Sequence, residues 1–153
     1  MSVNGEKANA YFCEGYNCAQ ATFLAFCEEA GLDEKTAARL ASGLGGGVGR
    51  QREVCGAITG MTMAAGLLRG YDTPTGGQEK TDTYALIQQL CAEFKERNGS
   101  IICRELLGLQ EAEGTPQAAP RTAQYYHDRR CADYCRDASD LLAAALQQGK
   151  ADA

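Results

Sequence analysis

The residues of this chain best suited to chemistry are its eight cysteines. They stand at positions 13, 18, 27, 55, 91, 103, 131 and 135. This is about 5% of the chain, below the roughly 8–10% that marks a secreted disulfide scaffold. In a reducing compartment such cysteines serve as free thiols, metal ligands or redox-active pairs. Since a single cysteine is often only a small buried hydrophobe, position along the chain has to separate these roles.

Four of the cysteines fall near predicted helix starts. Cys18, Cys55 and Cys103 follow an asparagine, a glycine-rich run and a serine, respectively, and Cys131 joins them if Asp128 caps the last helix. A helix N-terminus carries about half a positive charge, which lowers the pKa of a thiol. We therefore predict that the first three approach one another, with thiols more acidic than a free cysteine, and that Cys131 is the fourth member.

Four thiolates from separate helices suit zinc or an iron–sulfur cluster, because both take sulfur ligands in fours. The chain has no C-x-x-C, and without C-x-x-C-H no covalent haem is expected. Its only histidine, His127, is predicted to be a surface or capping residue. Cys91 lies on the apolar face of an amphipathic helix and is predicted to pack in the core. The roles of Cys13, Cys27 and Cys135 stay open.

The sequence predicts that the elements that position these cysteines are helices. Apolar residues recur at helical spacing in five or six segments, and no stretch shows the alternation of a strand. We predict an all-α fold, a single compact bundle of about five to six helices over residues 1–153. Val54–Leu68 carries no charge and is too short for the roughly 20 residues of a membrane span, so we place it at the centre. Gly56, Gly60 and Ala64 give it a smooth face for close helix approach.

The glycine-rich run 43–49 precedes Arg50 and Arg52 and allows two interpretations. It could cradle an anion, although it matches neither common phosphate-binding motif. Its simpler role is to turn the chain so that Cys55 enters the next helix near the site. Arg104 is either a solvated charge or a partner for a neighbouring thiolate.

Several segments resemble the C_GCAxxG_C_C family of redox proteins, named for its four spaced cysteines. By this resemblance the family cysteines fall on Cys18, Cys55, Cys103 and Cys131, the same four that the helix starts select. Cys135 stands where the family usually has an aliphatic residue. The segments that carry the resemblance are GYNCAQATFLAF (15–26), GLGGGVGRQREVCGAITGMTMAAGL (43–67), FKERNGSIICRELLG (94–108) and a closing C-x-x-x-C-x-x-A.

The family is also similar to part of the split-Soret cytochromes, which bind haem through the motif missing here. Because those cytochromes pair, the resemblance implies a homodimer, an expectation that ultracentrifugation can test. The formal net charge of −5 argues against nucleic acid or an anionic membrane as a partner. The first residues lack the basic and apolar blocks of a signal peptide, so we expect a cytoplasmic protein.

Three classes of function follow. The first is an electron carrier or oxidoreductase in which Cys18, Cys55, Cys103 and Cys131 hold an iron–sulfur cluster or another metal. The second is a metal-free dithiol/disulfide oxidoreductase that uses the first three of these thiols. The third is a helical interaction module with structural cysteines. The sequence names neither a substrate nor a redox partner, which can be a protein or a small molecule.

Overall fold

The structure, a computed structural model, describes residues 1–111 and 114–152. These residues form helices and no strand, and one isolated antiparallel bridge joins Val54 to Ile102. The predicted all-α class is confirmed. The helices are α1 (Val3–Glu14), α2 (Cys18–Cys27), α3 (Glu34–Ala41), the 3-10 turn η1 (Ser42–Leu44), α4 (Gly45–Val48), α5 (Gly56–Arg69), α6 (Gly77–Asn98), α7 (Cys103–Leu106), α8 (Ala123–Asp128) and α9 (Cys131–Ala151).

This is more helical segments than the five to six expected, and the C-terminal region shows one reason. The Thr122 side chain accepts a hydrogen bond from the Tyr125 backbone and starts α8, which ends at Asp128. The backbone of Arg129 is then extended, and a new helix begins at Cys131. The expected single last helix is therefore two, and Asp128 ends the first of them.

Local capping explains why the N-terminal helices begin where they do. Asn17 and Gln20 form a reciprocal capping box that starts α2 at Cys18, as predicted. The Asp33 side chain accepts from the Thr36 backbone at the start of α3. The capping box places Cys18 in the first turn of its helix through contacts that are local in sequence.

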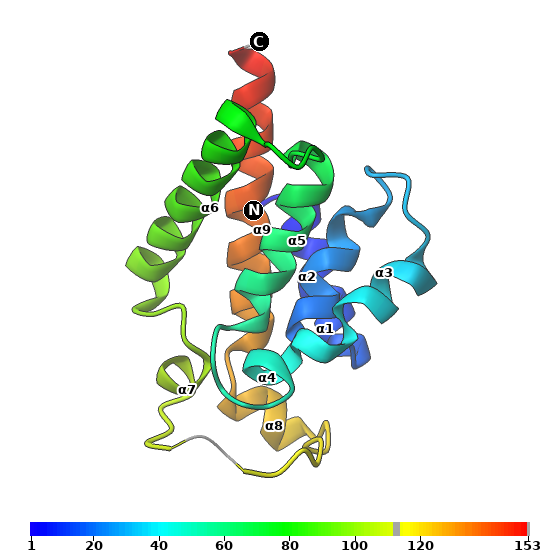
Figure 1. The fold of residues 1–153 in the computed structure, drawn as a ribbon. Coiled ribbons are helices and arrows are strands. Elements are labelled where there is room, and N and C mark those ends of the chain that lie inside the picture. Colours follow the sequence, from blue (N-terminus) through cyan, green and yellow to red (C-terminus); the bar gives the residue numbers. More distant parts are fainter. Residues whose placement is uncertain (112–113, 153) are drawn as a thin grey trace.

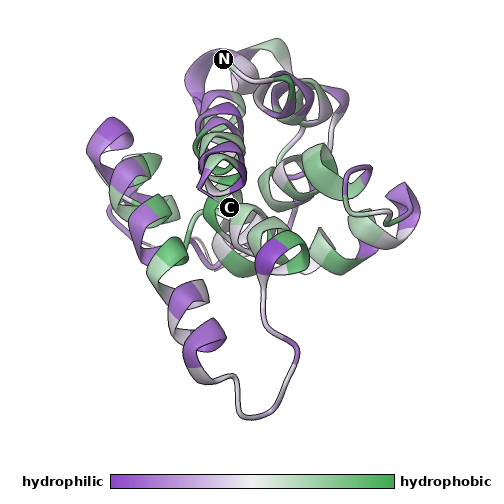
Figure 2. Cartoon of the chain, turned by 90° about the horizontal axis from the view of Figure 1, so that it is seen from above, coloured by the Kyte–Doolittle hydropathy of each residue, from purple (hydrophilic) through white to green (hydrophobic). Residues whose placement is uncertain are grey.

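Helices α2, α5 and α9 pack against one another, and α1 covers α2 and α9. Figure 1 shows α4, α7 and α8 together at one end of this bundle. In Figure 2 the hydrophobic segments gather toward the middle, and α6 lies to one side with a mostly hydrophilic surface. The largest fully buried apolar side chains are Phe12, Phe26, Phe94, Leu24, Met61, Leu90 and Leu142.

Helix α5 occupies the central position predicted for Val54–Leu68, since it contacts α2, α6 and α9. Its small-residue face allows the expected close approach to α2. A Cβ atom at Gly60 would lie 2.5 Å from the Ala19 carbonyl oxygen, and one at Gly56 would overlap the Cys18 sulfur. Among the described helices, none combines the length and the apolarity that a bilayer crossing requires.

The tight α2/α5 contact predicts that Gly60→Ala destabilises the protein. The added methyl meets backbone, which cannot rotate away, and overpacking of this kind costs about 1–3 kcal/mol. Gly66→Ala is the matched control on the same helix, because a Cβ there meets nothing within 4 Å. It should gain about 0.5–1 kcal/mol from helix propensity. Urea denaturation measures both, and equal stability of the two variants would contradict the close approach.

Candidate functional site

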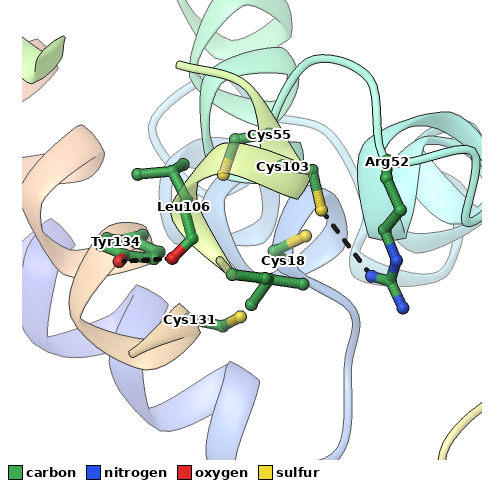
Figure 3. Close-up of a pocket in the computed structure, with 9 residues that line it drawn as sticks. Cys18, Arg52, Cys55, Cys103, Leu106, Cys131 and Tyr134 are labelled. Carbon is green, nitrogen blue, oxygen red and sulfur yellow. Dashed lines mark hydrogen bonds between the residues drawn. The ribbon is translucent and has the colours of Figure 1, made fainter. Parts of the chain in front are cut away.

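Four cysteines from four helix starts line one pocket at the end of the bundle that holds α4 and α7. Cys18, Cys103 and Cys131 are the first residues of α2, α7 and α9, and Cys55 directly precedes α5. Figure 3 shows their sulfur atoms turned toward the same space. The cavity has a volume of about 30 Å³. The other residues that line it are Gly46, Arg52, Leu106, Leu107 and Tyr134.

Backbone hydrogen bonds hold Cys55 and Cys103 on two paired segments. The Cys55 N–H donates to the Ile101 carbonyl at 2.8 Å, and the Cys103 N–H donates to the Glu53 carbonyl at 2.6 Å. These bonds flank the isolated bridge between Val54 and Ile102, which lie in the segments that precede α5 and α7. The sequence predicts that Ser100 starts the helix of Cys103, but Ser100 does not cap α7 directly. Its hydroxyl instead accepts a hydrogen bond from the Ile102 N–H at 3.0 Å. The two cysteines are thus fixed relative to each other by main chain.

Cys18 is fixed by its helix cap and by α5. The Asn17 side chain caps α2 and also donates to the Ser42 carbonyl at 3.0 Å, which ties this helix start to the glycine-rich run. The Cys18 sulfur packs against Gly56, where only a glycine leaves room for it. The small-residue face of α5 therefore positions a site cysteine as well as a helix.

Arg121 anchors the chain that leads to Cys131. Its guanidinium lies 4.3 Å from the centroid of the Phe12 ring and donates to the Phe12 and Tyr16 carbonyls. The carbonyl of Phe12 lies near the C-terminus of α1, where a cation is favoured. This contact pins the segment before α8 to α1, and α9 then begins close to the pocket.

The glycine-rich run makes a left-handed turn beside the pocket. Gly46, Gly47 and Gly49 have positive φ angles, as do Val48 and Arg50. A Cβ at Gly47 would lie 2.5 Å from the Glu53 nitrogen, so the returning chain needs a glycine there. The run therefore turns the chain toward Cys55, in agreement with the simpler of its two interpretations.

This turn also directs Arg52 into the pocket, which the sequence did not predict. Arg52 has a positive φ of 61° and is only 2% exposed. Its Nη1 donates to the Cys103 sulfur at 3.7 Å (Figure 3). Arg104, the arginine considered as a thiolate partner, instead pairs with Glu53 at 3.2 Å and donates to the Arg52 carbonyl. The direction of Arg52 depends on the left-handed turn, for which the sequence offers only its glycines as a signal.

Burial governs the ionisation of the pocket thiols in the metal-free protein. It raises the pKa of Cys55 well above the ordinary value, and the neighbouring Cys18 adds to the effect. Burial raises the pKa of Cys131 to about 12, again with a contribution from Cys18. Burial also raises the pKa of Cys103, although Arg52 opposes the shift. The predicted acidity of Cys55 and Cys103 is therefore wrong, because desolvation of a thiolate outweighs the helix-end charge.

The other cysteines lie outside this pocket. Cys13 is exposed, and Cys27 is buried in the core. Cys91 packs against the core, as predicted, and lines a separate surface hollow with Lys95. Cys135 is completely buried and its sulfur donates to the Cys18 carbonyl at 3.6 Å, so it lies directly behind the site.

The sulfur atoms share a pocket but do not surround a single point. In the part of the chain that the structure describes, no three His, Cys, Asp or Glu side chains form a group that could hold one metal ion. His127 takes no part in the pocket, since its side chain is 82% exposed and pairs with Asp128. The expectation of a surface histidine is confirmed.

These burial patterns predict the order in which thiols of the reduced, metal-free protein react with iodoacetamide at pH 7. Exposed Cys13 should react first. Cys55 and Cys103 should react much more slowly because they are buried, and Cys131 because a thiol of pKa about 12 is almost entirely protonated. Peptide mapping by mass spectrometry gives the order, and the protein in urea, where all eight react, is the control. Early labelling of Cys131 would contradict the closed pocket.

Comparison with known proteins agrees with the spacing of these cysteines. Searches of curated proteins and of solved structures found no significant match. A family model described as "Putative redox-active protein (C_GCAxxG_C_C)" matches residues 16–145, which include all four pocket cysteines. Since this match covers most of the chain, the protein belongs to the C_GCAxxG_C_C family.

Proposed function

We propose that the protein is an electron carrier whose four pocket cysteines hold an iron–sulfur cluster. The observation that carries this proposal is the convergence of Cys18, Cys55, Cys103 and Cys131, from four separate helix starts, on one closed pocket. Packing alone does not require cysteine at four such places. Iron–sulfur clusters are commonly held by four cysteine thiolates.

The arrangement of the sulfurs suits a cluster better than a single zinc ion. A tetrahedral zinc site needs its ligands around one point, and the described residues contain no such group. A cluster distributes its ligands over several iron atoms, so its cysteines need only share a pocket. The four-sulfur donor set, without a histidine or carboxylate, supports this cofactor by its chemistry, whereas the cavity of about 30 Å³ is smaller than a cluster.

The residues of the chain have distinct roles in this proposal. Cys18, Cys55, Cys103 and Cys131 would hold the cluster, which supplies reversible one-electron transfer when bound. Arg52 offsets part of the negative charge of the thiolates. The apolar side chains of Leu106 and Leu107, together with Tyr134, restrict water. Because two of the four cysteines are buried, the site is better suited to pass electrons than to bind a substrate.

The second candidate is a metal-free dithiol/disulfide protein, favoured by the size of the cavity. About 30 Å³ accommodates little more than one water molecule. In this case two pocket thiols form one S–S bond and release two protons and two electrons to an oxidant such as a disulfide or a quinone.

Iron and acid-labile sulfide analysis on anaerobically purified protein, with a visible spectrum, separates the two candidates. We expect iron and sulfide in equal amounts and a visible absorption that dithionite bleaches. Single Ser substitutions of Cys55 or Cys103 should remove most of the bound iron, because each takes away one thiolate ligand. A colourless sample without iron or zinc would exclude the cluster and leave the dithiol candidate.

Cys91→Ala is the matched control for these substitutions. Cys91 packs against the core but lines a different hollow, so its loss should leave iron content and absorption unchanged. Loss of cofactor in this variant, with helix content retained, would show that the wrong cysteines were assigned to the site.

A further inference from the structure

We propose that Arg52 raises the reduction potential of the four-cysteine site by placing a fixed positive charge against Cys103. The inference rests on the proposed function only in that the pocket undergoes reduction. It does not depend on which of the two chemistries operates. In both, Arg52 acts through Cys103 and is a positioning and charge-compensating residue.

The position of Arg52 is enforced by the fold. Its side chain is 2% exposed, and its Nη1 reaches the Cys103 sulfur at 3.7 Å. A Cβ at Gly47 would lie 2.7 Å from the Arg52 Cα, so the turn admits this backbone only because a glycine faces it. On the other side, the Arg104 backbone and side chain both donate to the Arg52 carbonyl. The guanidinium is therefore held in the pocket wall by contacts along its own main chain.

The sign of the effect follows from charge balance. Reduction of a cluster adds one electron to a site that already carries thiolate charge. Reduction of a disulfide adds two electrons and yields thiols or thiolates. In the cluster couple the reduced form is the more negative, and a nearby cation stabilises it. In the disulfide couple the cation acts on the Cys103 thiolate, which Arg52 favours over the protonated thiol. The interaction is strong because water is largely excluded from the pocket.

The charge of Arg129 also lowers the pKa of Cys103 and of Cys131, but Arg52 has the larger influence on Cys103. Arg130 directly precedes Cys131, but its side chain is 67% exposed. Solvent and salt screen such a charge. Arg130 therefore offers a control in which the same charge is removed from an exposed position beside a site cysteine, where its guanidinium lies 5.7 Å from the centroid of the Tyr134 ring.

The test is a redox titration of wild-type protein and three variants at one pH. Arg52→Gln and Arg52→Met remove the charge, and the Met side chain itself carries no N–H or oxygen that would need a partner. For a cluster, each variant should lower the midpoint potential by at least about 59 mV. This shift corresponds to a tenfold change in the equilibrium constant of a one-electron couple. Arg52→Lys keeps a positive charge and should recover at least half of the shift. Arg130→Gln should shift the potential by less than half as much as Arg52→Gln.

The outcomes separate this inference from the proposed function. If the protein holds no cluster, the disulfide couple is titrated with glutathione, and about 30 mV then corresponds to tenfold. The cluster proposal fails in that case. The inference about Arg52 still predicts that removal of its charge lowers the midpoint potential, now of the disulfide couple. An unchanged or higher potential in folded Arg52→Gln or Arg52→Met overturns it. If both charge-removing variants unfold while Arg52→Lys folds, the role is structural and the inference is also overturned. The absence of any reducible couple would refute both proposals.

Discussion

The close contact between α2 and α5 is the constraint on which the site depends. Two glycines on α5 let the helices approach until backbone meets backbone, and the same contact seats the Cys18 sulfur against Gly56. Cys55 immediately precedes that glycine, so two site cysteines are brought together by one packing arrangement. The main-chain pairing of Val54 with Ile102 then adds Cys103. Long-range packing and one short backbone bridge thus assemble a site from residues far apart in sequence.

Burial of the cysteine thiols in this assembly opposes their ionisation to thiolates. Burial in the pocket raises the pKa of Cys55, Cys103 and Cys131, and so favours the protonated thiols at these positions. Thiolates become favourable there only when positive charge replaces the protons. The fold supplies one such charge in Arg52, and the family to which the chain belongs is described as redox-active. Bound iron would supply the rest under the proposed function.

The sequence predicted the features that depend on local signals. The asparagine cap before Cys18 is set by neighbouring residues, and the structure has it at Asn17. Arg52 could not be predicted, since its direction follows from several successive left-handed residues, including non-glycine ones. Thiol acidity was misjudged because helix-end charge can be read from sequence, whereas the depth of a pocket cannot. The position of Cys135 behind Cys18 likewise depends on how α9 packs on α2.

The most direct test of the central claim is X-ray absorption at the iron edge of anaerobically purified protein. The account predicts iron surrounded by sulfur alone, with a second iron atom close by, and a loss of this signal when Cys103 is replaced by Ser. Cysteines from four helices would then share one polynuclear centre. Iron bound by oxygen or nitrogen, or a sulfur-bound iron that persists without Cys103, would contradict a cluster held in this pocket.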